Sequence, residues 1–442
     1  MSGLDETHDP AAKSWVTSAN DPASPFPIQN LPFGSFRVKG GIDWRLGIAI
    51  GERVLDLRAA TDTGLLDELP GELRATLKAD LLNPLLTQPP SDWTMVRRAL
   101  FALLSDPAQS VRVKAALLPQ SAIDLRVPMQ IGGYTDFFAS IHHARRTAKL
   151  LRGADDVASN YRHLPVGYNG RASSVVVSGT PVTRPSGQFV ATPGAAPQFG
   201  PSRRLDFELE IAAVVGGHND LGRPVPIALA EDRIFGLCLM NDWSARDIQA
   251  FEYQPLGPFL GKSFATTISP WIVTMDALKP FRTPLEPHPE GDPAPLPHLR
   301  EPAGAKSGFA LDLTAAIRTA SMRTGQTAPA IVTRTQARYL YWSFAQVIAH
   351  HASNGCNLIA GDLIGSGTVS GPAETEAASL LELTANGTHG ISLGDGESRT
   401  CLEDGDEVGI EGVAQAAGYR SIGLGSCSGV VMPAGTNTNA GQ

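Results

Sequence analysis

Apolar and polar positions alternate strictly along the segment that begins at Leu205. Every odd position from Leu205 to Ile211 is apolar, which predicts one buried side of a strand. The even positions carry Asp206, Glu208 and Glu210 and then continue into alanine and valine, so the acidic side also enters the protein. With no Lys or Arg interleaved, such carboxylates, roughly 6 to 7 Å apart, either raise one another's pKa values or bind a cation. The polar face of an ordinary antiparallel strand is the alternative.

A second hydrophobic run predicts a buried strand that leads into a helix. Ile234–Met240 is continuously apolar, and the Asn-Asp pair that follows it is typical of a helix start. A helix from that point places one polar stripe at Asp242, Arg246, Gln249 and Tyr253. An ordinary surface ion pair between Asp242 and Arg246 is the alternative.

Two glycine-rich stretches can bring the backbone close to a ligand. In PLGPFLGKSFATT, the glycines stand beside donors and possible ligands from Lys262, Ser263 and Thr266. Thr368 lies between glycines, where its hydroxyl can approach a ligand, although a turn residue is the ordinary interpretation.

Three titratable residues elsewhere are candidates for chemistry. Asp136 and His143 share one face if the residues between them are helical, separated by about 10 Å along the axis, so one can hold a metal while the other works on a substrate. A lone His is more often structural, and the adjacent His142 shows that the residue type alone proves little. Glu382 lies among leucines and is either on the outer face of a strand or buried with a partner.

Composition narrows the class of protein. A chain of 442 residues with plentiful glycine and proline predicts two domains and a strand-rich enzyme. The net charge of -8 and the lack of a basic cluster argue against a nucleic-acid partner. No apolar run approaches the roughly 18 residues of a membrane span, and the polar start has no secretory character, so we expect a soluble cytoplasmic protein. The four cysteines form no CxxC motif, which favours a reduced compartment and no structural zinc.

The pattern along the chain predicts its organisation. We expect a flexible leader over 1–24 and a first domain over 25–126, in which short strands precede a helical portion at 65–118. A second domain is expected over 127–433, followed by a disordered tail at 434–442.

Three further features belong to the expected second domain. The prolines of 279–308 predict an extended surface excursion. Thr333 and Gln336 form a capping-box pattern, which predicts a packed helix from there to Gly355. Short strands divided by Gly, Asp and Asn turns are expected in the last part of the chain.

Several segments together resemble one known family. In chain order they are YTDFFASIHHA, LPVGYNGRASSVVVSGTP, LDFELE, NDWSARDIQ, PLGPFLGKSFATT, HHASNGCNL and GDLIGSGTVSGP, and from about Phe26 to about Pro433 the chain resembles the fumarylacetoacetase family. The resemblance implies an α+β fold, mainly β, with a small N-terminal β-barrel-like domain before a larger mixed-β catalytic domain. It also implies a homodimer that hydrolyses the carbon–carbon bond of 4-fumarylacetoacetate, a small diketo-dicarboxylate. The products are fumarate and acetoacetate, in the last step of tyrosine and phenylalanine catabolism.

The resemblance also implies which residues form the site. It places the metal at Asp136, Glu208, Glu210, Asp242, Lys262 and Thr266. It places substrate contacts at Phe138, Arg152, Tyr168, Gln249, Tyr253 and Thr368. The catalytic residues that it implies are His143, Glu382, Arg246, Gln249 and Lys262.

The implied mechanism must handle a leaving group that departs with carbanion character. A divalent cation chelated by a β-diketone spreads this charge into an enolate, and all-oxygen ligands favour Ca²⁺ or Mg²⁺ over zinc. In this hypothesis His143, oriented by Glu382, deprotonates the water that attacks the carbonyl. Arg246, Gln249 and Lys262 stabilise the oxyanion, and Lys262 is alternatively the acid that protonates the departing carbon.

Two positions depart from the family pattern. Phe138 replaces a tyrosine that touches the substrate, and Ala265 stands where glycine is usual. The first change can alter substrate preference. The rival interpretations are a related hydrolase or decarboxylase acting on another β-diketo acid of the acylpyruvate type, and a metal-stabilised protein without catalysis.

Overall fold

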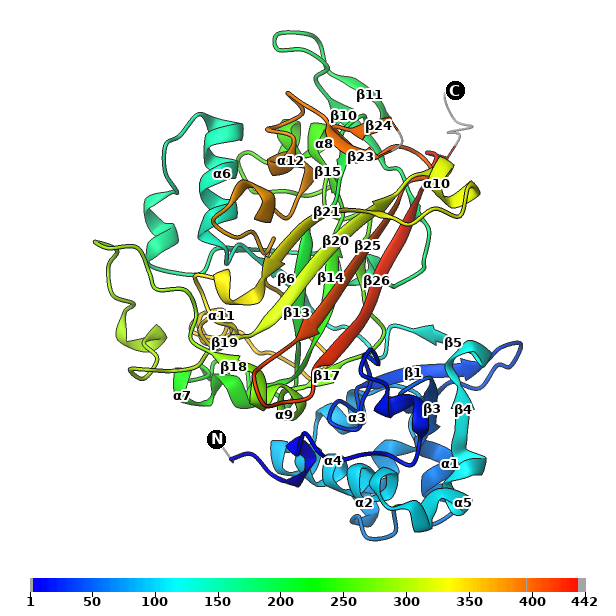
Figure 1. The fold of residues 1–442 in the computed structure, drawn as a ribbon. Helices are drawn as coiled ribbons and strands as arrows, with labels where there is room; N and C mark the ends of the chain where they lie inside the picture. Colours follow the sequence, from blue (N-terminus) through cyan, green and yellow to red (C-terminus); the bar gives the residue numbers. More distant parts are fainter. Residues whose placement is uncertain (1–2, 395, 436–442) are drawn as a thin grey trace.

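The computed structural model describes residues 3–394 and 396–435, which form two domains of mixed α and β structure (Figure 1). The N-terminal domain contains an antiparallel sheet in the order β4-β3-β2-β1-β5. Its strands are β1 Phe33–Val38, β2 Arg45–Ile50, β3 Arg53–Asp56, β4 Leu117–Pro119 and β5 Ile123–Arg126. Its helices are α1 Leu57–Asp62, α2 Gly71–Leu77, α3 Asn83–Leu86, α4 Pro90–Ser105 and α5 Ser110–Val113. A small sheet domain with helices is therefore confirmed.

The N-terminal segment is packed, so the prediction of a flexible leader is wrong for residues 3–24. The segment contains the short helices η1 Glu6–His8 and η2 Thr17–Asn20. Arg97 of α4 is buried and donates to the Thr7 hydroxyl at 3.0 Å and to the Asn30 carbonyl at 2.7 Å. A buried guanidinium needs several acceptors, and the leader supplies some of them, which a polar sequence alone does not reveal.

The C-terminal domain, which the resemblance implies is the catalytic domain, is built on a mixed central sheet in the order β7-β6-β22-β13-β14-β16-β8, with β17 also paired to β14. Its strands are β6 Tyr134–Phe137, β7 Gly167–Asn169, β8 Val175–Val177, β13 Leu209–Val215, β14 Ile234–Asp242, β16 Thr266–Ile268, β17 Val273–Thr274 and β22 Leu363–Gly365. The β22–β6 and β16–β8 pairs are parallel, and β13 runs antiparallel to both of its neighbours.

A second sheet in the order β21-β20-β25-β26-β9 packs against the central one (Figure 1). Its strands are β9 Val182–Thr183, β20 Leu311–Arg318, β21 Ala330–Gln336, β25 Glu407–Ala414 and β26 Ile422–Met432. Alternation along β13 explains the layers. Leu209 and Ile211 belong to the core shared with the second sheet, whereas Ala212 and Val214 belong to the core shared with the N-terminal domain. The acidic side of this segment thus enters the protein, as predicted.

Short elements complete the catalytic domain. The helices are α6 Ile141–Arg152, α7 Ile227–Ala230, α8 Arg246–Glu252, α9 Met275–Leu278, α10 Ala320–Thr324, α11 Phe344–His351 and α12 Leu380–Leu383. The two-stranded ribbons are β10 Ser186–Phe189 with β11 Gln198–Pro201, β12 Leu205–Asp206 with β15 Ser244–Ala245, β18 Arg282–Thr283 with β19 Gly308–Phe309, and β23 Ile391–Gly394 with β24 Glu397–Arg399. Its 3-10 turns are η6 Ser159–Arg162, η7 Ala172–Ser174, η8 Glu231–Arg233, η9 Lys279–Phe281, η10 Pro297–Leu299, η11 Ala337–Tyr339 and η12 Glu374–Glu376. The turns η3 Pro107–Gln109, η4 Lys114–Ala116 and η5 Gln120–Ala122 belong to the N-terminal domain.

The helix predicted from Thr333 is wrong at its start. Thr333 and Gln336 lie in strand β21, and the helix α11 begins only after Ser343, which forms the actual capping box with Gln346. Both pairs have the same Ser/Thr-x-x-Gln spacing, and β-branched residues buried on one side of β21 decide for the strand there.

The proline-rich segment 279–308 is largely irregular, as predicted, but it is anchored to the domain. Phe281 and Leu299 are buried in the catalytic core, so this segment is more than a surface excursion. From residue 436 onward the predicted disordered tail lies outside the described residues. Within the described part of the chain, no helix combines the length and apolar character needed to cross a membrane.

Candidate active site

A cavity of about 340 Å³ opens beside the central sheet and gathers most of the predicted site residues. The six predicted substrate contacts line it, namely Phe138, Arg152, Tyr168, Gln249, Tyr253 and Thr368. It is also lined by Asp136, His143, Glu208, Arg246 and Lys262. A larger hollow of about 700 Å³ lies elsewhere, around Met129, Arg171 and Asp362, and contains none of the predicted site residues. The chemistry is therefore concentrated in the smaller cavity.

Four buried carboxylates converge beside this cavity, and two of them line it. They are Asp136, Glu208, Glu210 and Asp242, and one oxygen of each lies within 4.8 Å of the others. Sheet register explains the convergence, because Gly365 of β22 pairs with Asp136 of β6 on one side and with Ala212 of β13 on the other. The next strand, β14, ends at Asp242.

The structure corrects three local predictions. Asp242 is the last residue of strand β14, and the helix α8 begins only at Arg246, so the predicted polar stripe does not lie on one helix. Asp136 lies on β6 whereas His143 lies on α6, so they do not share a helix face. The alternating segment is interrupted at Glu208, between β12 and β13. In each case pairing between strands overrides the local pattern.

Glu210 and Asp136 form no ion pair among the described residues, and Asp136 Oδ1 accepts only from the Gly367 N–H, at 3.1 Å. Both oxygens of Glu210 lack a hydrogen-bond partner among the described residues. Burial, reinforced by the charge of Asp136, raises the pKa of Glu210 well above its usual value. Burial and the charge of Asp242 likewise raise the pKa of Asp136. Without a cation, this part of the site favours protonated carboxyls.

Two buried cations balance the other carboxylates. Arg246 donates to Glu208 Oε1 at 2.7 Å, and Lys262 donates to Glu208 Oε2 and, at 2.8 Å, to Asp242 Oδ2. Burial alone would raise the pKa of Glu208, but Lys262 and Arg246 more than offset it, and the pKa lies well below its usual value. Burial opposes the charge on Lys262, yet Asp242 and Glu208 keep its pKa above the usual value.

The donor set fits a hard divalent cation. The four groups offer only oxygen, and the two Glu210 oxygens are otherwise unused. The hydroxyl of Thr266 donates to Asp242 Oδ1 at 3.1 Å and so supports a ligand. The ammonium of Lys262 has no lone pair to offer a metal, so this side chain contacts the ligands instead. The cluster is a buried acidic site suited to a divalent metal.

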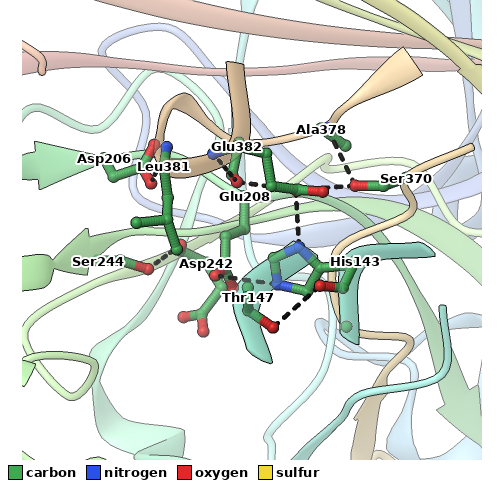
Figure 2. A network of polar contacts seen from close by, with 12 residues as sticks. His143, Thr147, Asp206, Glu208, Asp242, Ser244, Ser370, Ala378, Leu381 and Glu382 are labelled. Atoms are coloured by element: carbon green, nitrogen blue, oxygen red, sulfur yellow. Dashed lines mark hydrogen bonds and ion pairs between the residues drawn. The ribbon is translucent and has the colours of Figure 1, made fainter. Parts of the chain in front are cut away.

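The imidazole of His143 lies next to the cluster and is oriented by the carboxylate of Glu382 on α12. His143 Nδ1 lies 2.7 Å from Glu382 Oε2, and its Nε2 lies 3.9 Å from Glu208 Oε1 (Figure 2). The Glu382 carboxylate accepts further bonds from Ser370 and Ser379, each at 2.9 Å. Because an ionised carboxylate can only accept, Nδ1 carries the proton, which leaves Nε2 free to act as a base.

Glu382 is held in its ionised form. Burial would raise its pKa, but His143 and Arg146 reverse the shift and bring the pKa down to about 2. Arg146 lies 3.3 Å from Glu382 Oε1. Glu382 lies in the short helix α12, so of the two alternatives it is buried with a partner, although not on a strand.

The sequence did not predict three residues that hold the His143–Glu382 dyad, in which the imidazole is bonded to the carboxylate. They are Arg146, Ser370 and Ser379. Ser379 and Glu382 form a Ser-x-x-Glu pattern, a capping-box signal that could have identified α12. Arg146 follows His143 by three residues on α6, which places both on neighbouring positions of one helix surface. No local signal points to Ser370.

The predicted substrate contacts differ in their surroundings. The Tyr168 hydroxyl donates to Asp242 Oδ2 at 2.6 Å, so it touches the acidic cluster. Gln249 Oε1 accepts from Arg246 at 3.1 Å. The buried Thr368 hydroxyl has no partner within the described chain and is free to meet a ligand.

The remaining contacts lie around the cavity wall. Phe138 packs edge-on against the His143 ring with centroids 5.1 Å apart. Arg152 ends α6 with an exposed side chain, and Tyr253 is partly buried just after α8. Ala265, beside Thr266, is buried. The predicted residues are thus brought together, with Arg152 at the exposed edge.

Comparisons with known proteins agree along nearly all of the chain. The family model described as Fumarylacetoacetate (FAA) hydrolase C-terminal matches residues 134–432, and the one described as Fumarylacetoacetase N-terminal matches 29–128. The Caenorhabditis elegans fumarylacetoacetase is 47% identical over 433 residues, covering 96% of this chain and 99% of the relative. The Arabidopsis thaliana fumarylacetoacetase is 45% identical over 427 residues, covering 95% and 98%. The solved structure of Cg1458 with inhibitor, at 14% identity and a TM-score of 0.50 over 91% of this chain and 100% of that one, shares the fold.

Proposed function

This chain belongs to the fumarylacetoacetate hydrolase family, and we propose that His143 and the groups around it carry out its reaction. That reaction is the hydrolysis of 4-fumarylacetoacetate to fumarate and acetoacetate. The observation that carries the proposal is the position of the His143 imidazole between the hydrogen-bonded Glu382 carboxylate and the acidic cluster. Glu382 orients His143 through Nδ1, while Nε2 faces the acidic cluster at Glu208.

His143 acts as the general base. Its Nε2 takes a proton from a water molecule, and the resulting hydroxide attacks the substrate carbonyl at the bond to be cleaved. The charge that forms on the imidazole is stabilised by Glu382, which stays ionised because its pKa is about 2. Ser370 and Ser379 keep the carboxylate in place, so the base is oriented before the substrate arrives.

Arg246, Gln249 and Lys262 stabilise the oxyanion that the attack creates. Arg246 bonds to both Glu208 and Gln249, so its guanidinium is fixed at the cavity wall. Lys262 remains protonated, because Asp242 and Glu208 raise its pKa despite burial. It is therefore able either to stabilise the oxyanion or to protonate the departing carbon.

We assign the metal to Asp136, Glu208, Glu210 and Asp242, and propose Ca²⁺ or Mg²⁺ as the ion. When bound, this cation supplies Lewis-acid stabilisation for the negative charge of the leaving fragment. The residues themselves contribute a dry, preorganised cage, since all four side chains are buried. The two unpaired Glu210 oxygens support this assignment.

The substrate is a dicarboxylate, and the cavity offers polar groups at several depths. Arg152 at the exposed edge suits a distal carboxylate, and Thr368 offers an unused hydroxyl deeper in the wall. Phe138 supplies a ring without a hydroxyl, so one hydrogen bond to the substrate is absent there. The expected consequence is a change in KM rather than in reaction class.

The function is tested by following the loss of the 4-fumarylacetoacetate chromophore with the purified protein. Turnover that a chelator abolishes and added Ca²⁺ or Mg²⁺ restores supports both the reaction and the metal. An acylpyruvate is assayed in parallel. Faster turnover of the acylpyruvate, or no turnover of either compound, would contradict the proposal.

The family resemblance also supports a homodimer as a proposal. Sedimentation of the purified protein should give one species at twice the chain mass. A monomer over the whole concentration range would contradict this. A cytoplasmic location stays a prediction of the sequence.

A further inference from the structure

Asp206 is a buried carboxylate that joins two parts of the site, and the proposed mechanism does not use it. The residue is 1% exposed. Oδ2 accepts from Arg246 Nε at 2.8 Å and from the backbone N–H of Leu381 at 3.0 Å. Oδ1 accepts from the N–H groups of Leu380 and Phe207, at 2.7 and 2.8 Å. One carboxylate thus holds four donors, of which one lies on α8, two lie on α12 and one is the N–H of the next residue.

The donors on α8 and α12 belong to two different functional parts of the site. Arg246 belongs to α8 and faces the cavity, where it contacts Glu208. Leu380 and Leu381 begin α12, the helix that carries Glu382 (Figure 2). The position of Glu382, and through it that of the His143 ring, therefore depends on the same carboxylate that holds Arg246.

We propose that Asp206 is a positioning residue that aligns the oxyanion-stabilising Arg246 with the His143–Glu382 dyad. This inference rests on the proposed function and extends it to a residue without substrate contact. A catalytic base and an oxyanion site act on the same carbonyl, so their separation must be set to within a fraction of an ångström. Asp206 fixes that separation because it bonds to both sides at once.

The role requires a carboxylate rather than any polar group. All four neighbours of Asp206 are donors, and an ionised carboxylate offers acceptors in every direction. Asparagine has the same shape, but its NH₂ group would face either Arg246 and Leu381 or Leu380 and Phe207. One side of the link is then lost while the volume is kept.

A matched control lies on α8 itself. Asp247 accepts from the Ser202 hydroxyl at 2.6 Å and from the Arg203 N–H at 2.7 Å, so it also ties α8 to the preceding chain. Its bonds in the described structure do not reach α12. Asp247→Asn therefore removes a similar structural contact without touching the proposed alignment.

The test is steady-state hydrolysis of 4-fumarylacetoacetate by Asp206→Asn and Asp247→Asn, with kcat expressed per folded molecule. We expect Asp206→Asn to lower kcat about 30- to 100-fold with KM changed less than threefold. Asp247→Asn should retain kcat within twofold. In Asp206→Asn combined with Glu382→Gln, the loss should be clearly smaller than the product of the two single losses. A kcat loss below tenfold, an equal loss in Asp247→Asn, or losses that multiply in full would overturn the inference.

A second variant, Asp206→Glu, serves for the case in which Asp206→Asn does not fold. If Asp206→Asn gives no folded protein, Asp206→Glu keeps the charge and both oxygens but shifts them by about 1.5 Å. It should fold and still lose at least tenfold in kcat, and an unchanged kcat would overturn the inference. If the unsubstituted enzyme itself does not turn over 4-fumarylacetoacetate, the proposed function is wrong. If it does and the Asp206 variants match it, only the role of Asp206 is wrong.

Discussion

Two buried carboxylates in one site, Glu382 and Glu210, differ in how their charge is balanced. Glu382 accepts bonds from His143, Ser370, Ser379 and Arg146, and its pKa falls to about 2. The carboxylate of Glu210 has no hydrogen-bond partner within the described chain, and burial raises its pKa well above the usual value. The protein's own side chains therefore balance the charge of Glu382 but leave that of Glu210 unbalanced.

The difference separates two tasks. A carboxylate with every oxygen bonded is rigid, which suits the orientation of a base. A carboxylate without donors is costly alone and becomes favourable when a cation binds, which suits a metal ligand. Glu208 lies between the two regions, because it pairs with Lys262 and Arg246 and also lies 3.9 Å from His143.

Removal of the base should give the largest effect and leave the metal region intact. His143→Ala should lower kcat at least about 10³-fold, because no other group is placed to take the proton. Cation affinity should stay within threefold, since His143 is not a predicted ligand. Steady-state kinetics and calorimetric titration measure the two quantities.

His142→Ala is the matched control for this variant. His142 bonds to Glu286 at 2.7 Å and does not line the cavity, so its loss should leave kcat within twofold. Unaffected turnover in His143→Ala would remove this residue from the mechanism.

Loss of the Glu208 carboxylate should lower both the stability of the protein and its affinity for the metal. Glu208→Gln leaves Arg246 and Lys262 short of a buried counter-charge, so we expect the free energy of unfolding to fall by about 3 to 5 kcal/mol. Metal affinity should fall as well. Urea unfolding with and without Ca²⁺ checks both effects, and unchanged stability would show that Glu208 is not needed to balance the two cations.

The hydrogen-bonded carboxylate of Glu382 should make the free energy of unfolding fall at acid pH. Glu382 has its pKa lowered from 4.5 to about 2, so its stabilising contribution is fully present above pH 4.5 and is lost as pH falls toward 2. The shift corresponds to about 3 kcal/mol. The stability difference between the unsubstituted protein and Glu382→Gln should therefore shrink over this range in urea unfolding. A difference independent of pH would contradict the account of Glu382.

Substitution of Glu210, whose carboxylate has no partner, should raise the stability of the metal-free protein by a small amount. Burial and the charge of Asp136 make the ionised form of Glu210 unfavourable in the metal-free protein, so folding carries the cost of keeping this carboxyl protonated. Glu210→Gln removes that cost, and its amide can donate to the neighbouring carboxylates, so the metal-free protein should gain about 1 kcal/mol. Thermal unfolding after chelation measures this gain. A loss of stability would mean that Glu210 is already balanced by the protein.

The sequence predicted the composition of the site better than its geometry. Alternation from Leu205 identified Glu208 and Glu210 as acids on an inward side, because the pattern of a buried strand is local. It could not show the interruption at Glu208 or the end of β14 at Asp242, since both depend on pairing between strands. The family resemblance, rather than any spacing, supplied Asp136 as a ligand.

Contacts between distant segments were the hardest to predict. His143 and Glu382 meet across 239 residues, and no local pattern reports such an approach. The same holds for Asp206, whose acidic position was seen but whose link to α12 was not. The buried Arg97 that holds the leader is a further case, because a polar leader and an arginine in a helix each look exposed when read alone.

The central claim is that the four carboxylates bind one divalent cation beside His143, and calorimetric titration of the metal-stripped protein tests it most directly. We predict one Ca²⁺ or Mg²⁺ bound per chain, with an affinity about 100-fold weaker in Glu210→Gln and unchanged in Glu382→Gln. Absence of binding to the unsubstituted protein, or equal affinity in Glu210→Gln, would contradict the claim.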